Sequence, residues 1–178
     1  MSFNVLALCT ANICRSPMME MSLRRLTAAD GDVTVASAGS RGSDGRPADP
    51  VTATVASEFG LDLSSHQSQP LTAEVIDGAD LIVVAEMDHL LAVIDKRPQA
   101  FAKTFLLLEL ASVAGPRLPS ESLNEWVARH HEGRTPSAVM KSSTAFGLTD
   151  PYKQGDAKIR KAAQQVVDAT TAIATSWR

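Results

Sequence analysis

The residues with the clearest capacity for chemistry lie near the amino terminus, where Cys9 and Arg15 bracket a short loop that ends in Ser16. A cysteine thiolate is a strong nucleophile, and an arginine guanidinium can hold two oxygens of a phosphate in a fork. The Ser16 hydroxyl can donate a hydrogen bond to the thiolate. Asn12 tolerates a left-handed backbone and can pin the loop with its amide. The segment therefore predicts an anion site with a nucleophilic sulfur at its base.

The elements predicted on either side of this loop would place it between the end of a strand and the start of a helix, a position suited to binding an anion. An apolar strand is predicted over residues 3–8 and a helix over 17–27, with Pro17 in the first turn, where helices tolerate proline. Successive main-chain N–H groups of such a loop can form an anion nest, and the helix start adds unpaired donors and partial positive charge. These features favour the thiolate form of Cys9. The predicted phosphate-binding residues are Thr10, Ala11, Asn12, Ile13, Cys14 and Ser16.

A purely structural interpretation of the same residues is also open. Roughly one chain of this composition in eight would carry the Cys-x5-Arg spacing by chance, so the spacing alone is weak evidence. Cys9 and Cys14 could be small buried side chains, and Arg15 could make a surface ion pair. The strand before the loop and the Ser-Pro after it favour the anion site.

Strand-like and helix-like segments alternate along the first two-thirds of the chain. Predicted strands cover residues 3–8, 33–37, 81–85 and 104–107, and predicted helices cover 17–27, 50–59, 72–77, 87–96, 108–113 and 156–175. This alternation predicts an α/β fold with right-handed crossovers and a parallel sheet covered on both faces. The carboxyl end of the first strand is then the expected ligand crevice.

Composition narrows the possible functions. The 178 residues fit a single domain spanning 1–178, and 44% hydrophobic with 21% charged residues excludes disorder. The net charge of −3 and the 4% aromatic content argue against nucleic-acid binding. The apolar runs are too short for a membrane helix, and two cysteines without a secretory signal indicate reduced thiols in the cytoplasm. We expect no metal and no cofactor.

Residues 115–149 break the strand–helix rhythm and are predicted to form a surface insertion rather than a second domain. One short helix is predicted inside it, from a capping box at Ser122 and Glu125 to about His131. Asp150-Pro151 follows the insertion. A carboxylic acid can protonate a leaving oxygen, and Pro151 would stiffen the loop that holds it, so Asp150 is the candidate general acid.

Residues 9–17, Cys-Thr-Ala-Asn-Ile-Cys-Arg-Ser-Pro, resemble the signature of low-molecular-weight protein tyrosine phosphatases. Further segments match that family in the same order: 37–39, 45–49, 65–66, 80–88 and 150–152. The resemblance implies a three-layer α/β/α sandwich of the phosphatase I-like type, with four parallel strands in the order 2-1-3-4. It also implies a cysteine-dependent phosphomonoester hydrolase with a phosphocysteine intermediate on Cys9.

The resemblance suggests supporting parts for other residues. It implies that His66 buttresses the loop through Asn12, and that Asp88 has a similar structural part. It also implies that Cys14 could form a reversible disulfide with Cys9, against the alternative of inert packing.

Three departures from the family pattern stand out. Ala11 replaces a usual glycine, which would cost about 1 kcal/mol if the position needs a positive φ. Residues 40–44 lack the aromatic residue that often walls the cleft, and Trp126 is either a replacement wall or core. The insertion at 115–149 is the third.

The expected substrate is a phosphotyrosine-containing protein or a small phosphomonoester. Thiol-dependent arsenate reduction on the same fold is an alternative, although the chain has no resolving cysteine after Cys14. A non-catalytic phosphate-binding module is another. The sequence does not predict an oligomeric state.

Overall fold

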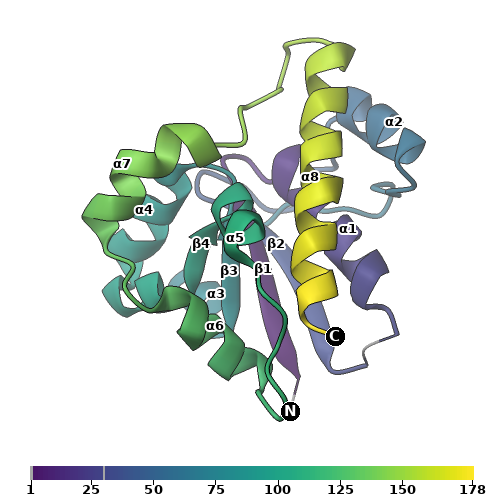
Figure 1. Cartoon of the computed structure of the whole chain (residues 1–178). Helices are drawn as coiled ribbons and strands as arrows, with labels where there is room; N and C mark the ends of the chain where they lie inside the picture. The colour runs from purple at the N-terminus through teal and green to yellow at the C-terminus, as the bar shows by residue number, and fades with distance from the viewer. Residues whose placement is uncertain (1, 30) are drawn as a thin grey trace.

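The computed structural model describes residues 2–29 and 31–178 and shows a central parallel sheet with helices on both faces (Figure 1). The strands are β1 (Phe3–Cys9), β2 (Val33–Gly39), β3 (Leu81–Val84) and β4 (Thr104–Leu106). Their order in the sheet is β2-β1-β3-β4, and all neighbours are parallel. The three-layer sandwich and its strand order, implied by the family resemblance, are therefore confirmed.

One face of the sheet carries the larger core. Alternate strand residues such as Val5 and Val83 are buried against helices on this side. The principal helices that cover it are α1 (Arg15–Thr27), α5 (Leu107–Val113) and α8 (Asp156–Ser176). The short helix α2 (Pro50–Glu58) packs beside α8.

The opposite face is covered by α3 (Ala73–Asp77), α4 (Met87–Lys96) and the 3₁₀ helix η1 (Pro98–Lys103). Strand residues such as Leu6 and Ile82 are buried there. The two interleaved sets of buried residues explain why the sequence of β3 is apolar throughout: a central parallel strand has no solvated face.

Residues 115–149 contain two helices rather than the single one predicted. The capping box predicted at Ser122 and Glu125 is present and begins α6 (Leu123–His131). The second helix, α7 (Pro136–Phe146), was missed because its serine-rich sequence is typical of loops. Thr135 caps its start, Pro136 occupies the first turn, and the serine hydroxyls bond back to carbonyls of the preceding turn.

Trp126 of α6 belongs to the larger core. Its side chain is fully buried, packs edge-on against Trp177 and donates from Nε1 to the carbonyl of Gly115. Of the two possibilities that the sequence left open for Trp126, the structure shows the core residue. The tryptophan therefore does not supply the missing aromatic wall.

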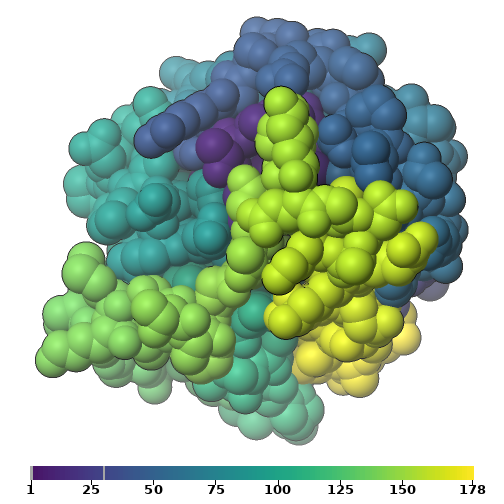
Figure 2. Space-filling model, turned by 90° about the horizontal axis from the view of Figure 1, so that it is seen from above, coloured from purple at the N-terminus to yellow at the C-terminus, as the bar shows by residue number. Residues whose placement is uncertain are grey.

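The fold brings the β1–α1 segment, the region after β2 and the segment around residue 150 together at the carboxyl end of the sheet (Figure 2). Seen from above, the purple β1–α1 segment lies at the centre of this face, with the blue region after β2 on one side (Figure 2). The yellow-green segment around residue 150 projects over it (Figure 2). Among the described residues, no helix is both long and apolar enough to cross a bilayer.

Candidate active site

The loop between β1 and α1 has an unusual number of free main-chain donors. Within residues 2–29 and 31–178, the N–H groups of loop residues 10–14 have no hydrogen-bond acceptor in the protein. Unpaired N–H groups in a loop that ends at a helix N-terminus favour an anion. Asn12 has the left-handed conformation that its residue type predicted, with φ of 58°. Ala11 is not among the residues with positive φ, so the anticipated strain at this position is absent.

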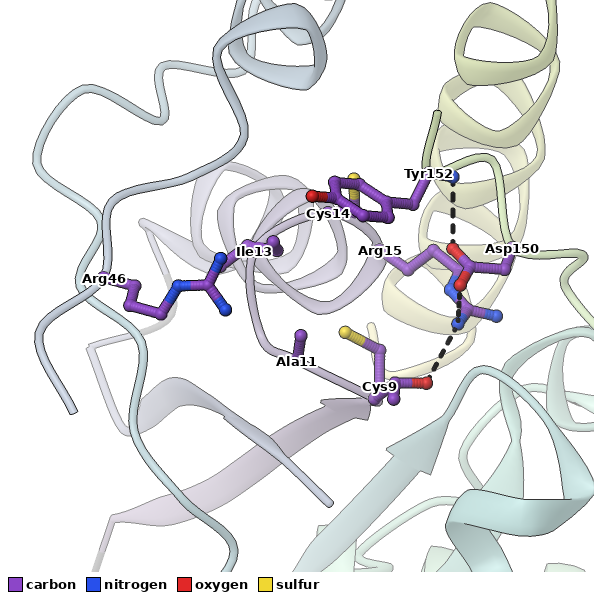
Figure 3. Close-up of a pocket in the computed structure, with 9 residues that line it drawn as sticks. Cys9, Ala11, Ile13, Cys14, Arg15, Arg46, Asp150 and Tyr152 are labelled. Atoms are coloured by element: carbon purple, nitrogen blue, oxygen red, sulfur yellow. Dashed lines mark hydrogen bonds and ion pairs between the residues drawn. The ribbon is translucent and has the colours of Figure 1, made fainter. Parts of the chain in front are cut away.

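Cys9 lies at the end of β1 with its sulfur on the inner side of this loop (Figure 3). The residue is buried, and its Sγ lies 3.0 Å from Oγ of Ser16. Oγ of Ser16 also accepts a hydrogen bond of 2.9 Å from Nδ2 of Asn12. The Ser16 hydroxyl proton then has two acceptors, the Cys9 sulfur and the more distant carbonyl oxygen of Ala38 at 3.4 Å, and when it points at the sulfur it stabilises a thiolate.

Asn12 is fully buried, and every polar group of its side chain is used. Its Nδ2 also donates to Oγ of Ser37, 2.8 Å away, and its Oδ1 accepts from the main-chain N–H of Gln69. Ser37 in turn donates to the buried carboxylate of Glu20. A side chain held from helix α1, strand β2 and the loop at Gln69 keeps the shape of the phosphate loop independent of any ligand.

His66 lies against the outside of the same loop. Its Nε2 is 2.7 Å from the carbonyl oxygen of Asn12, and because a carbonyl can only accept, Nε2 must carry a proton. Its Nδ1 faces a carboxylate oxygen of Glu20 at 3.9 Å. The contact to Asn12 expected for His66 is therefore made through the main chain.

Arg15 is almost completely buried, with 1% of its surface exposed. Its Nη1 donates to Glu86 at 2.5 Å and to the carbonyl of Leu148 at 2.8 Å. Its Nη2 lies 3.3 Å from both Oγ1 of Thr10 and Oδ2 of Asp150. The buried Nε has no partner among the described residues. A buried N–H without an acceptor is costly, so this edge of the guanidinium suits an incoming oxyanion.

Asp150 is brought to the site by the chain that follows α7. The main-chain N–H of Leu148 bonds to the carbonyl of Ala85 at the end of β3, which anchors the loop to the sheet. The Asp150 carboxylate accepts from the main-chain N–H of Tyr152 at 3.2 Å, and nearly half of its side chain is exposed. Arg15 and Asp150 are far apart in the sequence but line the same pocket.

The pocket above Cys9 has a volume of about 240 Å³. Its lining comprises Cys9, Thr10, Ala11, Ile13, Cys14, Arg15, Arg46, Asp150 and Tyr152. Tyr152 is the one aromatic ring among these residues and lies beside Asp150, whereas Arg46 lies on the opposite side (Figure 3). An aryl group attached to a bound phosphate would therefore meet one aromatic ring and the apolar side chain of Ile13.

The loop support expected from Asp88 comes instead from its neighbour. Asp88 is exposed in the first turn of α4 and makes no hydrogen bond or ion pair within the described residues. His89 is buried, and its Nε2 lies 2.9 Å from Oγ1 of Thr10. Helical geometry explains the correction, because adjacent residues on a helix point about 100° apart. Burial, together with the charges of Arg15 and Arg41, lowers the pKa of His89 to about 3.

Three contributors were missed by sequence reasoning: Glu86, His89 and Arg46. Glu86 and His89 are joined at the start of α4, where the main-chain N–H of Glu86 donates to Nδ1 of His89 at 3.0 Å. Arg46 lies within the Gly-x-Pro-x-Asp match at 45–49 and carries no further signal in the sequence.

Cys14 lines the pocket, but its thiol contacts a neighbouring hydroxyl group. Its Sγ lies 2.7 Å from Oγ1 of Thr52, and burial raises the pKa of the Cys14 thiol to about 12. Both cysteines are free. Because the thiolate is the reactive species, Cys14 is a poor nucleophile in this conformation.

Taken together, the arrangement suits transfer of a phosphoryl group to sulfur. The loop amides and Arg15 can hold three oxygens of a tetrahedral anion, Cys9 lies beneath it, and Asp150 is placed at the pocket to exchange a proton with a leaving oxygen. No group of three metal-ligating side chains occurs in the part of the chain that the structure describes.

Comparison with known proteins gives a consistent result. The model of a family described as low molecular weight phosphotyrosine protein phosphatase matches residues 4–116. The chain is 37% identical over 131 residues to the low molecular weight protein-tyrosine-phosphatase Etp of Escherichia coli K12, covering 71% of this chain and 86% of that protein.

Solved structures are similar over nearly the whole chain. Wzb of Vibrio vulnificus, in complex with benzylphosphonate, is 29% identical with a TM-score of 0.74, covering 99% of this chain and 100% of that one. The tyrosine phosphatase AmsI of Erwinia amylovora is 27% identical with a TM-score of 0.72, covering 98% and 93%.

Proposed function

The chain belongs to the low molecular weight phosphotyrosine protein phosphatase family, and we propose that it hydrolyses phosphotyrosine in proteins through a phosphocysteine intermediate on Cys9. The observation that carries this proposal is the placement of the Cys9 sulfur inside a loop of unpaired N–H groups, with Arg15 and Asp150 at the same pocket.

In the first step, the Cys9 thiolate attacks phosphorus and the sulfur–phosphorus bond forms. The bond from phosphorus to the tyrosine oxygen breaks, and Asp150 gives its proton to that oxygen. Asp150 has to carry a proton in this step, because only the protonated carboxyl can donate. Arg15 and the loop amides stabilise the charge on the three non-transferring oxygens.

In the second step, water attacks phosphorus on the phosphocysteine. The Asp150 carboxylate accepts a proton from that water, the sulfur–phosphorus bond breaks, and the thiolate and inorganic phosphate are released. The Ser16 hydroxyl then donates to the sulfur as its negative charge returns, a step supported by the 3.0 Å between Oγ of Ser16 and Sγ of Cys9.

The nucleophile must remain a reduced thiol, and both cysteines are free in the structure. We therefore propose a cytoplasmic location, where thiols are kept reduced.

The test is hydrolysis of para-nitrophenyl phosphate and of a phosphotyrosine peptide by the wild type and by Cys9→Ser. We expect turnover of both substrates by the wild type and at least a thousandfold loss in Cys9→Ser, with vanadate binding retained. Arsenate-dependent thiol oxidation without ester hydrolysis would show the reductase instead, and phosphopeptide binding without turnover would show a binding module.

A further inference from the structure

Arg46 lies at the mouth of the pocket, on the side opposite Asp150 and Tyr152 (Figure 3). It belongs to the segment between β2 and α2, the same segment in which residues 40–44 lack an aromatic side chain. Its position gives the mouth a positively charged side that the proposed mechanism does not use.

The backbone that carries Arg46 is held in place. The main-chain N–H of Arg46 donates to Oγ of the buried Ser68, and the Arg46 carbonyl accepts from the N–H of Ser68. The N–H of Gly45 bonds to the Ser68 carbonyl, and the N–H of Asp49 bonds to the carbonyl of Ile13 in the phosphate loop. The starting point of the Arg46 side chain is therefore fixed relative to the anion site.

The Arg46 guanidinium makes no hydrogen bond or ion pair with any residue that the structure describes. The chain has eleven arginines, and eight of them use guanidinium nitrogens in hydrogen bonds or ion pairs. Among the described residues, the three whose guanidinium has no such contact are Arg41, Arg46 and Arg117. Two of these three lie at the site, because the main-chain N–H of Arg41 bonds to the carbonyl of Thr10.

Positive charge at the mouth contrasts with the net charge of −3 for the whole chain. On the other side of the pocket, Nζ of Lys153 lies 5.2 Å from the centre of the Tyr152 ring. The exposed Asp44, two residues before Arg46, makes no ion pair with it. Long-range fields of this kind select ligands of opposite charge.

We propose that Arg46 is a second anion subsite, which recognises the carboxylate of an acidic residue adjacent to the phosphotyrosine of a protein substrate. This inference rests on the proposed function and specifies its substrate. Arginine is suited to the part, because its planar fork can hold a carboxylate with two hydrogen bonds. An anchored backbone and an unpaired side chain mean that no internal contact has to break for this to happen.

The test compares two phosphotyrosine peptides that differ only in flanking residues, one with glutamate and one with glutamine on both sides. For the wild type we expect kcat/KM to be about three- to fivefold higher on the glutamate peptide, the usual size for a solvent-exposed ion pair. The ratio should fall to about one in Arg46→Ala and below one in Arg46→Glu. Arg117→Ala is the matched control and should keep the wild-type ratio, because Arg117 is also exposed but does not line the pocket.

A salt titration adds a second measurement. The wild-type ratio should shrink in 0.5 M sodium chloride, where charges more than about 4 Å apart are largely screened. Equal ratios in wild type and Arg46→Ala would overturn the subsite. So would an equal loss by Arg46→Ala on both peptides, since Arg46 would then serve the phosphoryl group that they share.

Failure of the proposed function would look different. In that case para-nitrophenyl phosphate and both peptides would all resist hydrolysis by the wild type. Binding of the same peptides to Cys9→Ser, followed by fluorescence anisotropy, would still measure the glutamate-to-glutamine ratio and its dependence on Arg46. A ratio of one in that binding experiment would reject the subsite without reference to catalysis.

Discussion

The imidazole Nε2 of His89 lies 2.9 Å from the hydroxyl oxygen of Thr10, and the direction of this hydrogen bond follows from the other ring nitrogen. The main-chain N–H of Glu86 donates to Nδ1 of His89 at 3.0 Å, so the neutral ring carries its proton on Nε2. The Thr10 oxygen therefore accepts from His89 and also from Nη2 of Arg15. With both lone pairs used, its own proton is free to point into the pocket that Thr10 lines.

This geometry predicts that His89 acts through Thr10. Thr10→Val and His89→Leu should each lower kcat/KM on para-nitrophenyl phosphate about fivefold, the size of one net hydrogen bond. The double variant should lose little more than the worse single variant, because both changes remove the same oriented hydroxyl. His89→Gln, which keeps a donor, should recover part of the loss. Fully multiplicative losses would show that the two residues act independently.

The neutral state of His89 also predicts a pH dependence of stability. Its pKa is about 3 when folded against an ordinary value of 6.5, so the unfolded chain binds the proton more readily between these values. Stability from this residue is therefore complete above pH 6.5 and falls as pH drops towards 3. Between pH 7.5 and pH 5, the free energy of unfolding should drop about 2 kcal/mol more in the wild type than in His89→Gln.

Urea unfolding at the two pH values measures this difference. The comparison with His89→Gln removes the effect of every other titrating group. The charges nearest to the ring, those of Arg15 and Arg41, stay positive throughout this range. Parallel pH profiles for the two proteins would mean that His89 can be protonated in the folded state.

The role proposed for Asp150 predicts a dependence on the leaving group. Asp150→Ala should lower kcat/KM, which reports phosphoryl transfer to Cys9, at least tenfold on phenyl phosphate and less on para-nitrophenyl phosphate, because a better leaving group needs its proton less. Phosphate inhibition should change little. Asp95→Ala is a matched control, since Asp95 is exposed and makes no ion pair in the described part of the chain. Identical losses on the two esters would remove Asp150 from proton transfer.

The two cysteines should differ strongly in reactivity. Cys9 lies at the base of the pocket, whereas burial raises the pKa of Cys14 to about 12. Iodoacetate at pH 7 should alkylate Cys9 alone, and inorganic phosphate should protect it. Peptide mass spectrometry distinguishes the two sites. After peroxide treatment, a disulfide with Cys14 should form slowly, and rapid formation would require Cys14 to leave the Thr52 hydroxyl.

The close approach of β2 to the phosphate loop predicts that Gly39 cannot be replaced. A Cβ at Gly39 would lie 2.8 Å from the carbonyl oxygen of Thr10 and 2.8 Å from Cα of Gly42, and both are main-chain atoms. Gly39→Ala should therefore lower the free energy of unfolding by at least about 2 kcal/mol. The same substitution should also reduce turnover, because the clash displaces the phosphate loop. Gly31→Ala serves as the control, because a Cβ at Gly31 would have no other atom within 4 Å. Wild-type stability in Gly39→Ala would mean that the loop yields easily.

The local features of this protein were readable from its sequence. The strand–loop–helix around Cys9, the left-handed Asn12 and the capping box at Ser122 each depend on residues within a few positions of one another. Alternating apolar segments likewise indicated the parallel sheet. Backbone preference and hydrophobic burial act over these short distances, so a linear pattern records them.

Only the tertiary structure decided which distant groups share the pocket. Arg15 meets Glu86, Leu148 and Asp150 because the ends of the parallel strands and the loop after α7 converge at one edge of the sheet. Whether Asp88 or His89 faces the loop depends on the rotation of α4 against the sheet, a packing outcome that no local pattern encodes. The sequence also could not show that the Arg46 guanidinium has no partner among the described residues, because that depends on which groups the fold brings near it.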